Sequence, residues 1–297
     1  MASVAAVTTL TRPPVGELLR GWRQRRRLSQ LDLALDAEVS ARHLSFLETG
    51  RARPSREMVL RLADRLEVPL RERNELLLAA GFAPAYGRRA LDAPDMAAVT
   101  RALDLVLTAY EPYPALVVDR SWDLVTANGS VALFLDGVAP HLLEPPANVL
   151  RLSLHPDGLA PRIANLPQWR SHVLHRLGRE AHLTGDPGLA ALHRELSALP
   201  GGTDRSTPDG IAVPLRVRVG DEVLSFLSTV TTFGTAVDLT AAELSVEAFL
   251  PADERTAEVL RAGRSPAANP RLPGGERGTA AAPDPRRTHD RGSRHRP

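Results

Sequence analysis

The segment from Gln30 to Ser55 places apolar and small residues at a spacing that fits two short helices joined by a tight turn. The positions that such a pair of helices buries all hold apolar residues, namely Leu33, Ala37, Val39, Leu44 and Leu47. The small Ala34 stands where the two helices would cross, and a loop with Arg51 and Arg53 follows. The spacing therefore predicts a compact helical hairpin with a basic loop behind it.

Serine residues mark the start of both helices. Ser29 can cap the first, with Asp32 in the reciprocal place of a capping box, and Ser40 can cap the second. Gly50 follows as a stop signal. Glu38 departs from the pattern, since glycine is common at this point of the turn and a left-handed backbone costs other residues roughly 1 kcal/mol. Because the caps, the small residue and the arginine loop coincide, we interpret the segment as a helix-turn-helix unit rather than a chance hairpin.

Helical periodicity continues on both sides of this unit, from Val15 to about Gly81. Three further stripes of apolar residues recur at helical spacing: Val15, Leu18, Leu19 and Trp22; Val59, Leu62, Ala63 and Leu66; and Leu70, Leu76, Leu77 and Ala80. Gly81 ends the last stripe. The N-terminal part is therefore predicted to be a five-helix domain of about 70 residues.

The formal net charge of +2 hides a division along the chain. Residues 12–89 carry 16 Arg against 10 acidic residues, and residues 263–297 carry 8 against 3. The remainder carries 13 against 22. Two basic ends flank an acidic middle, so we expect an anionic partner at the ends rather than over the whole surface.

The period of the apolar residues changes in the second half of the chain. Residues 81–95 mix Gly, Pro and small residues, which is typical of a linker. Residues 115–128 and 211–234 are rich in β-branched and apolar residues and each contains a turn signal, which predicts strands. Helices are predicted at 94–110, 166–182 and 187–199. We expect an α+β domain with a sheet flanked by helices.

Composition excludes several classes of protein. The chain has no cysteine, which excludes disulfides, thiolate nucleophiles and zinc-finger sites. The N-terminus lacks a basic region ahead of its apolar residues, and no apolar run approaches the roughly 20 residues needed to cross a bilayer, so we expect a cytoplasmic protein with no membrane partner. Residues 263–297 have no apolar periodicity and are predicted to be a disordered Arg/Pro/Gly-rich tail.

Long segments of the chain match a known pattern. LSQLDLALDAEVSARHLSFLETGRARPS resembles the helix-turn-helix of phage-repressor/Cro-like (XRE-type) regulators, and SFLETGRARPSREMVLRLADRLEVPLRERNELLLAAGFAPAY is similar to their MmyB-like branch. The similarity continues through EPYPALVVDRSWDLVTAN, NVLRLSLHPDGLAPRIANLPQWR and LSFLSTVTTFGTAVDLTAAELSVEAFLPAD, and so covers about residues 12–260. The resemblance implies a PAS-like second domain. The predicted parts are a DNA-binding domain at 12–86, a linker at 87–94, a PAS-like ligand-binding domain at 95–262 and the tail at 263–297.

In a unit of this kind the second helix enters the major groove and the first crosses the backbone. The residues expected to contact DNA are Gln30, Ser40, Ala41, Arg42, His43, Ser45, Arg51 and Arg53. Arg42 is the candidate for sequence discrimination because its guanidinium can donate two bonds to a guanine edge, with a phosphate contact as the alternative. The family pattern implies that Gln30 binds phosphate or braces the recognition residues. Arg51, Arg53 and part of the cluster Arg23, Arg25, Arg26 and Arg27 are expected to contact phosphates.

The same resemblance implies that the second domain encloses an apolar cavity for a fatty-acid-like ligand. The residues that could line it are Trp122, Phe134, Leu150, Leu154, Trp169, Val173, Phe226 and Phe233, with ordinary core packing as the alternative for each. A ligand carboxylate needs a positive or hydrogen-bonding anchor, and the candidates are Arg151, His155, Arg170, Asn128 and Tyr113. Ligand occupancy would then alter dimer geometry or linker order and so change DNA binding.

Two other functions fit parts of the sequence. The second domain could serve only to assemble dimers or dock a protein partner, in which case we expect a filled core. An enzyme is the second alternative, since His172 and His175 are spaced i, i+3 and His155 and Asp157 suggest acid-base chemistry. It is the weaker one because no HExxH, GxSxG, Walker A or GxGxxG pattern is present. We expect a homodimer that binds double-stranded DNA and a small apolar ligand, with no catalytic activity, metal or cofactor.

Overall fold

The computed structural model describes residues 13–202, 204 and 212–263. The predicted tail therefore lies outside the described residues, apart from Gly263. So does the expected first residue of the DNA-binding domain at position 12.

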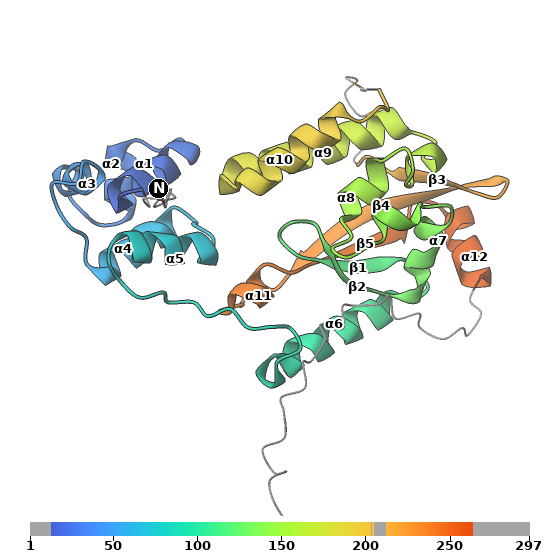
Figure 1. Ribbon diagram of the computed structural model, residues 1–297, viewed down its shortest axis with the longest axis horizontal. Coiled ribbons are helices and arrows are strands. Elements are labelled where there is room, and N and C mark those ends of the chain that lie inside the picture. The colour runs from blue at the N-terminus through green and yellow to red at the C-terminus, as the bar shows by residue number, and fades with distance from the viewer. Residues whose placement is uncertain (1–12, 203, 205–211, 264–297) are drawn as a thin grey trace, which may run out of the picture.

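Five helices form the N-terminal domain, as predicted (Figure 1): α1 (Val15–Arg25), α2 (Gln30–Asp36), α3 (Ala41–Glu48), α4 (Arg56–Arg65) and α5 (Leu70–Ala79). The residues predicted to be buried in the helix-turn-helix unit lie in one apolar cluster, within which Val39 is only partly buried. Ser29 and Asp32 form the predicted capping box of α2, and Ser40 caps α3. The capping residues and the apolar spacing therefore indicate the same two helices of the helix-turn-helix unit.

All five helices end in the same motif. The residue two positions past each helix has a left-handed backbone: Arg27, Glu38, Gly50, Glu67 and Gly81 have φ angles of 57°, 57°, 72°, 47° and 86°. The N–H of the following residue then bonds back to the third-last carbonyl of the helix, as from Val39 to Ala34 at 2.9 Å and from Phe82 to Leu77 at 2.8 Å. This is the Schellman arrangement, and it confirms the left-handed conformation predicted at Glu38.

The predicted linker is fastened to both domains. The side-chain oxygen of Asn74, on α5, accepts the N–H groups of Ala85 and Tyr86 at 2.9 and 3.1 Å. Further along, the N–H of Leu239 donates to the Gly87 carbonyl at 2.9 Å. The chain between the domains therefore follows a fixed path before a short 3-10 turn (Pro94–Met96) and α6 (Ala97–Tyr110).

A five-stranded sheet forms the centre of the C-terminal domain. Its strands are β1 (Ala115–Val118), β2 (Leu124–Ala127), β3 (Leu215–Val219), β4 (Glu222–Thr232) and β5 (Ser245–Pro251). Their order is β2-β1-β5-β4-β3, and every neighbouring pair is antiparallel. The last strand in the sequence thus occupies the middle of the sheet (Figure 1).

Helices cover both faces of this sheet, which confirms the α+β class. One face carries α7 (Ala132–Leu135), α8 (Val149–Leu154), α9 (Leu166–Thr184) and α10 (Pro187–Ala198), and the other carries α6 (Figure 1). A short helix, α11 (Leu239–Ala242), precedes β5, and α12 (Glu254–Ala262) follows it. Each face has its own apolar core. No helix within the described ranges is long and apolar enough to span a membrane.

Candidate DNA-binding surface and ligand cavity

The second helix of the helix-turn-helix unit, α3, lies at the outer edge of the N-terminal domain (Figure 1). Ser40 accepts the N–H of His43 at 3.1 Å and so fixes the first turn. Arg42 is exposed, and its guanidinium lies 5.4 Å from the centre of the half-buried Phe46 ring. Ala41, His43 and Ser45 are half-buried on the same short helix. The predicted base-reading residues therefore share one accessible helix.

Gln30 belongs to a part-buried network around the buried Glu48. The Glu48 side chain is 2% exposed and receives the Nε and Nη2 groups of Arg23 at 2.6 and 2.8 Å. The Gln30 amide donates to the same carboxylate at 2.9 Å. Burial would raise the pKa of Glu48, but the hydrogen bonds from Arg23 and Gln30 outweigh that effect and lower it. Gln30 is thus bonded to the last residue of α3, away from the recognition residues, and both of its suggested roles stay predictions.

The arginine cluster is divided between the interior and the surface. Arg23 is bonded to Glu48, and Arg26 donates to the Leu66 and Glu67 carbonyls at the end of α4, both at 2.8 Å. The guanidinium of Arg25 lies over the Trp22 ring at 4.1 Å. These three side chains therefore have partners within the protein. Arg51 and Arg53, in the loop after α3, are exposed.

An apolar cavity of about 70 Å³ lies in the core between the sheet and helices α7 to α9. Four predicted lining residues do line it: Phe134, Leu150, Trp169 and Val173. The rest of the lining is Leu116, Leu124, Val131, Leu135, Val149, Leu152, Ser153, Leu159, Arg176, Leu215, Glu247 and Phe249. Trp122, Leu154 and Phe226 are buried in the same core without lining the cavity. The wall is thus apolar except at Ser153, Arg176 and Glu247.

Phe233 requires a correction. It packs against the core on the opposite face of the sheet, with residues of α6, because it follows the end of β4 where the strand has passed the cavity. It is therefore remote from the predicted lining.

The predicted carboxylate anchors also lie elsewhere. Arg151 is paired with Glu195 on the surface at 2.5 and 2.8 Å, and Arg170 donates to the carbonyls of Gly202, Ser197 and Leu199. Asn128 is bonded to backbone groups of β1 and α6, at Ala115 and Leu107, and also to the Tyr113 carbonyl. None of the five predicted anchors is among the residues that line the cavity.

Arg176 and Glu247 are the charged residues of the lining, and sequence reasoning did not select either. Arg176 could have been found, because it continues the helical stripe of Trp169 and Val173 along α9. Glu247 interrupts the apolar run of β5, and a charged residue in such a strand needs a partner. Its partner comes from α9, which no local pattern predicts.

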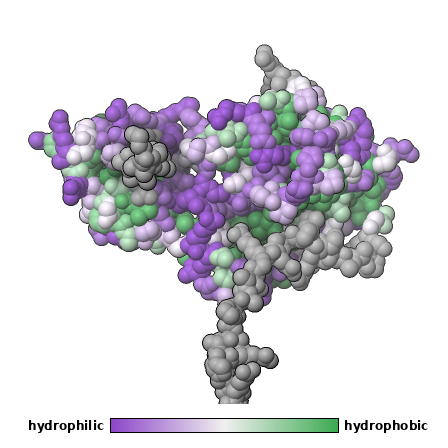
Figure 2. All heavy atoms as spheres, viewed as in Figure 1, coloured by the Kyte–Doolittle hydropathy of each residue, from purple (hydrophilic) through white to green (hydrophobic). Residues whose placement is uncertain are grey.

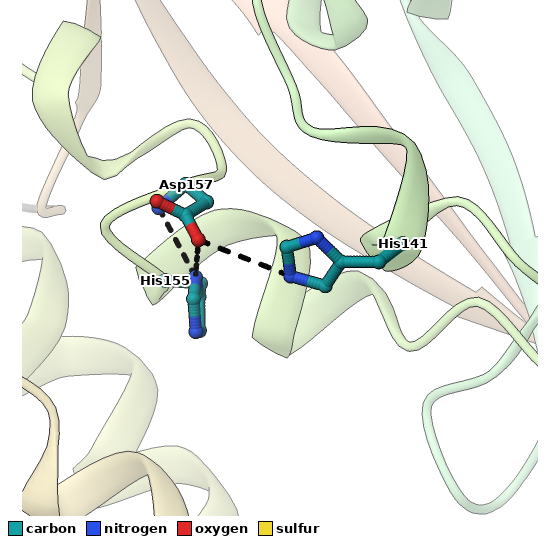
Figure 3. Close-up of side chains that lie close together, drawn as sticks. All are labelled: His141, His155 and Asp157. Carbon is teal, nitrogen blue, oxygen red and sulfur yellow. Dashed lines mark hydrogen bonds and ion pairs between the residues drawn. The ribbon is translucent and has the colours of Figure 1, made fainter.

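His155 belongs to a separate surface cluster (Figure 3). Nitrogen atoms of His141 and His155 lie 3.9 and 3.8 Å from Asp157 Oδ2, and the Asp157 N–H donates to His155 Nδ1 at 3.1 Å. The potential ligand atoms all lie within 4.8 Å of one another. His141 and Asp157 are exposed, and the cluster joins the turn after α8 to the 3-10 turn Pro140–Leu142. It is an arrangement of the surface, separate from the cavity lining.

Comparison with known proteins matches both halves of this arrangement. A family model described as a helix-turn-helix domain matches residues 14–76, which contain α3 and its basic loop. A second model, the ligand-binding domain of MmyB-like transcription regulators, matches residues 99–262. The chain is therefore a transcription regulator that joins a DNA-binding helix-turn-helix to a ligand-binding domain. It belongs to the MmyB-like family, whose model covers more than half of its residues. A comparison with curated proteins found no match.

Proposed function

We propose that this regulator binds specific DNA sequences through α3 and that its PAS-like C-terminal domain senses a small apolar ligand, a fatty acid or another acyl compound. The observation that carries the proposal is the cavity, whose lining residues are apolar except for Ser153, Arg176 and Glu247. Such a lining suits an alkyl chain. We propose further that the protein is not an enzyme and that it acts in the cytoplasm, where it meets DNA.

Ligand entry must enlarge the cavity. Its volume of about 70 Å³ is well below the roughly 300 Å³ at which pockets for small molecules begin. Part of the wall consists of the short helices α7 and α8 and their connections, whereas the rest is the long helix α9 and the central sheet. A bound acyl chain would therefore displace wall segments. The state with the enlarged cavity would bind the ligand more tightly than the closed state, so the ligand would favour the enlarged state.

Strand β5 connects the cavity to the DNA-binding domain. Glu247 on this strand lines the cavity, and Glu243, just before the strand, accepts two bonds from Arg71 of α5, both at 2.6 Å. Arg120 lies between the same groups, 3.4 Å from Glu243 and 3.5 Å from Glu72 of α5, and also contacts Asp186. A shift of β5 would therefore strain the ion pairs that hold α5.

A second connection starts at the turn between β1 and β2. Trp122 follows Arg120 by two residues and has a left-handed backbone, with a φ of 65°. Its ring supports the guanidinium of Arg176 at 4.3 Å, and Arg176 lines the cavity. The turn that carries Arg120 therefore also supports a charged residue of the cavity lining.

We also propose that the protein binds DNA as a homodimer, with its two α3 helices in half-sites about one helical turn, roughly 34 Å, apart. Ligand-dependent strain at α5 would change the separation of those helices. Light scattering on the purified full chain would measure the oligomeric state, and a monomer at operator-binding concentrations would contradict this part of the proposal.

The test of the ligand role is mass spectrometry on an organic extract of denatured full-length protein, with residues 1–90 purified in parallel. We expect an apolar acyl compound in stoichiometric amount in the full-length sample alone. That compound, titrated at fixed salt, should change operator affinity. An unchanged affinity would contradict the coupling and leave the DNA-binding role intact.

The small cavity favours one alternative, in which the C-terminal domain only assembles dimers or docks a protein partner. An empty extract, together with no binding of added alkyl compounds and a dimer that depends on residues 95–262, would support that alternative.

A further inference from the structure

Two histidines and an aspartate meet on the surface of the C-terminal domain (Figure 3). His141 lies in the 3-10 turn Pro140–Leu142, and His155 and Asp157 lie in the turn after α8. Nε2 of His141 and Nδ1 of His155 lie 3.9 and 3.8 Å from Asp157 Oδ2, and the potential ligand atoms of all three residues lie within 4.8 Å of one another. Side chains from two separate segments therefore converge on one point.

The backbone holds these two segments together independently of the three side chains. The N–H of Ala139 donates to the Asp157 carbonyl at 2.9 Å, and the N–H of Gly158 donates to the His155 carbonyl at 2.9 Å. The rings of His141 and His155 are in edge contact, with their centres 5.9 Å apart. The points from which the three side chains extend are thus set by the fold, which reduces the entropy that a bound ion would cost.

The nitrogen that His155 presents is in the form that a metal ion requires. Its Nδ1 accepts the N–H of Asp157 at 3.1 Å, so this nitrogen carries a lone pair rather than a proton. Metal ions bind the neutral imidazole through such a lone pair. An ion would take the place of this N–H as the partner of Nδ1. Because Asp157 is exposed, water can satisfy the displaced N–H.

The spacing of the three ligand atoms is close to that of a metal site. Zinc holds nitrogen and oxygen ligands at roughly 2.0–2.2 Å in tetrahedral geometry, which places neighbouring ligand atoms about 3.3 Å apart. The ligand atoms of this cluster would have to approach one another by roughly 0.5 to 1.5 Å. Since His141 and Asp157 are exposed, rotations of these two side chains can supply the movement. Water would complete the coordination from the open side.

We propose that His141, His155 and Asp157 bind a divalent transition-metal ion, such as Zn²⁺, Ni²⁺ or Co²⁺. Two imidazole nitrogens and one carboxylate suit these ions, whereas Mg²⁺ and Ca²⁺ prefer sites made of oxygen ligands. No metal was expected from the sequence, because α8 separates His141 from the other two residues along the chain. The site depends neither on the proposed apolar ligand nor on DNA binding.

The site lies between two segments that continue into the cavity wall. The turn of His141 follows α7, which carries Phe134, and Asp157 follows α8, which carries Leu150; both Phe134 and Leu150 line the cavity. A bound ion would cross-link the two segments and hold them more firmly than the backbone bond between Ala139 and Asp157 alone. Metal should therefore raise the thermal midpoint of the protein.

Calorimetric titration of the full-length protein without an affinity tag would test the site with Ni²⁺, Zn²⁺ and Mg²⁺ in turn. We expect saturable binding of Ni²⁺ and Zn²⁺, each with a higher thermal midpoint, and no binding of Mg²⁺ at the same concentrations. His141→Ala and Asp157→Asn should each weaken the tightest Ni²⁺ site by about tenfold or more, since changes even in residues behind the ligands cost a metal site this much. His182→Ala, at an exposed position of α9, is the matched control and should leave the affinity unchanged.

The proposal is overturned if neither Ni²⁺ nor Zn²⁺ shows saturable binding. It is also overturned if both His141→Ala and Asp157→Asn retain the affinity of the unmodified protein, because the ion would then bind elsewhere. Mg²⁺ binding as tightly as Ni²⁺ would contradict the nitrogen ligands. Both variants change exposed side chains, and their thermal midpoints without metal would show that they fold.

Discussion

Arginine residues of the DNA-binding domain serve two different purposes. Arg23 and Arg26 direct their N–H groups to acceptors within the domain, whereas Arg42, Arg51 and Arg53 are exposed on α3 and the loop behind it. Arg42 can reach base edges, since it lies in the first turn of the helix expected in the major groove. Arg51 lies behind that helix, where phosphate contacts are expected.

Arg42→Ala should therefore weaken binding to a selected operator by about 1–3 kcal/mol and leave binding to random DNA much less affected. Arg51→Ala should weaken both to a similar extent and lower the salt dependence by about one counterion. Fluorescence anisotropy at several salt concentrations would measure both effects. Equal losses for the two variants on both DNAs would show that Arg42 contacts phosphate instead.

Glu48 should determine how the N-terminal domain responds to acid. Because its pKa is lowered in the folded protein, Glu48 contributes stability above the ordinary glutamate pKa of about 4.3, and this contribution is lost as the pH falls through the lower folded value. Glu48→Gln should cost about 2 kcal/mol at neutral pH and flatten the stability profile at acid pH. Urea unfolding from pH 7 down to pH 3 would test this. A profile as steep as that of the unmodified protein would exclude Glu48, and Glu17→Gln, on the exposed side of α1, is the control.

Side-chain roles could be predicted where they depend on near neighbours in the sequence. Ser29, Asp32 and Ser40 were identified as caps because their partners lie three residues away. Arg176 and Glu247 were missed because they are 71 residues apart and only the packing of α9 on β5 joins them. Residue chemistry indicates that a buried charge needs a partner, but not which residue supplies it.

At the scale of elements, the helix ends of the N-terminal domain carry a backbone cost. Arg27, Glu38 and Glu67 adopt left-handed conformations that glycine adopts more easily. Only Glu38 was predicted to do so, because its place in the turn between α2 and α3 is known from the helix-turn-helix pattern. At Arg27 and Glu67 the left-handed backbone lets the N–H of the following residue bond to the third-last carbonyl of the helix.

Glu67→Gly should consequently stabilise the domain by up to about 1 kcal/mol, because glycine removes the steric cost of the left-handed backbone. Arg61→Gly, at an exposed position inside α4, should destabilise it by about 1 kcal/mol. Opposite shifts of the thermal midpoint are the expected result. A lower midpoint for Glu67→Gly would indicate that the glutamate side chain makes a stabilising contact of its own.

The central strand is one of the elements that sequence reasoning did not identify, as are the short helices α7, α8 and α11 and the last helix α12. Residues 245–251 contain Glu247, and an acidic residue within a short apolar run reads as a surface position. In the structure this strand has neighbours on both sides, and its alternate residues face the two cores, Val246 and Ala248 on one face and Glu247 and Phe249 on the other. The pairing with Arg176 and Ser228 makes the charge tolerable there.

At the scale of the whole molecule, the two domains meet through charged groups, and Figure 2 shows hydrophilic residues over the region where they approach each other. Arg71 and Arg120 lie among Glu72, Asp186 and Glu243. Burial raises the pKa of Glu72, which indicates that water is partly excluded from this junction. The order of the domains was predictable from sequence, whereas this junction and the fixed path of the linker were not.

Charge reversal at the junction should separate the domains. Arg71→Glu would face Glu72 and Glu243 with a like charge, so we expect a larger radius of gyration by small-angle X-ray scattering and a smaller effect of ligand on operator affinity. The double variant Arg71→Glu, Glu243→Arg should restore both. Arg65→Glu, on the exposed side of α4, is the control for changed net charge. An unchanged radius in Arg71→Glu would show that other contacts hold the domains together.

The place of β5 between Glu243 and the cavity has a consequence for how the regulator reads its ligand. If the ligand changes the affinity of the protein for DNA through α5, as proposed, then DNA must change the affinity for the ligand by the same factor, since linkage between two binding sites is reciprocal. Operator DNA is then itself an effector of the cavity. Copies of the protein at promoters and copies free in the cell would respond at different ligand concentrations, so the number of operators would help to set the threshold of the response.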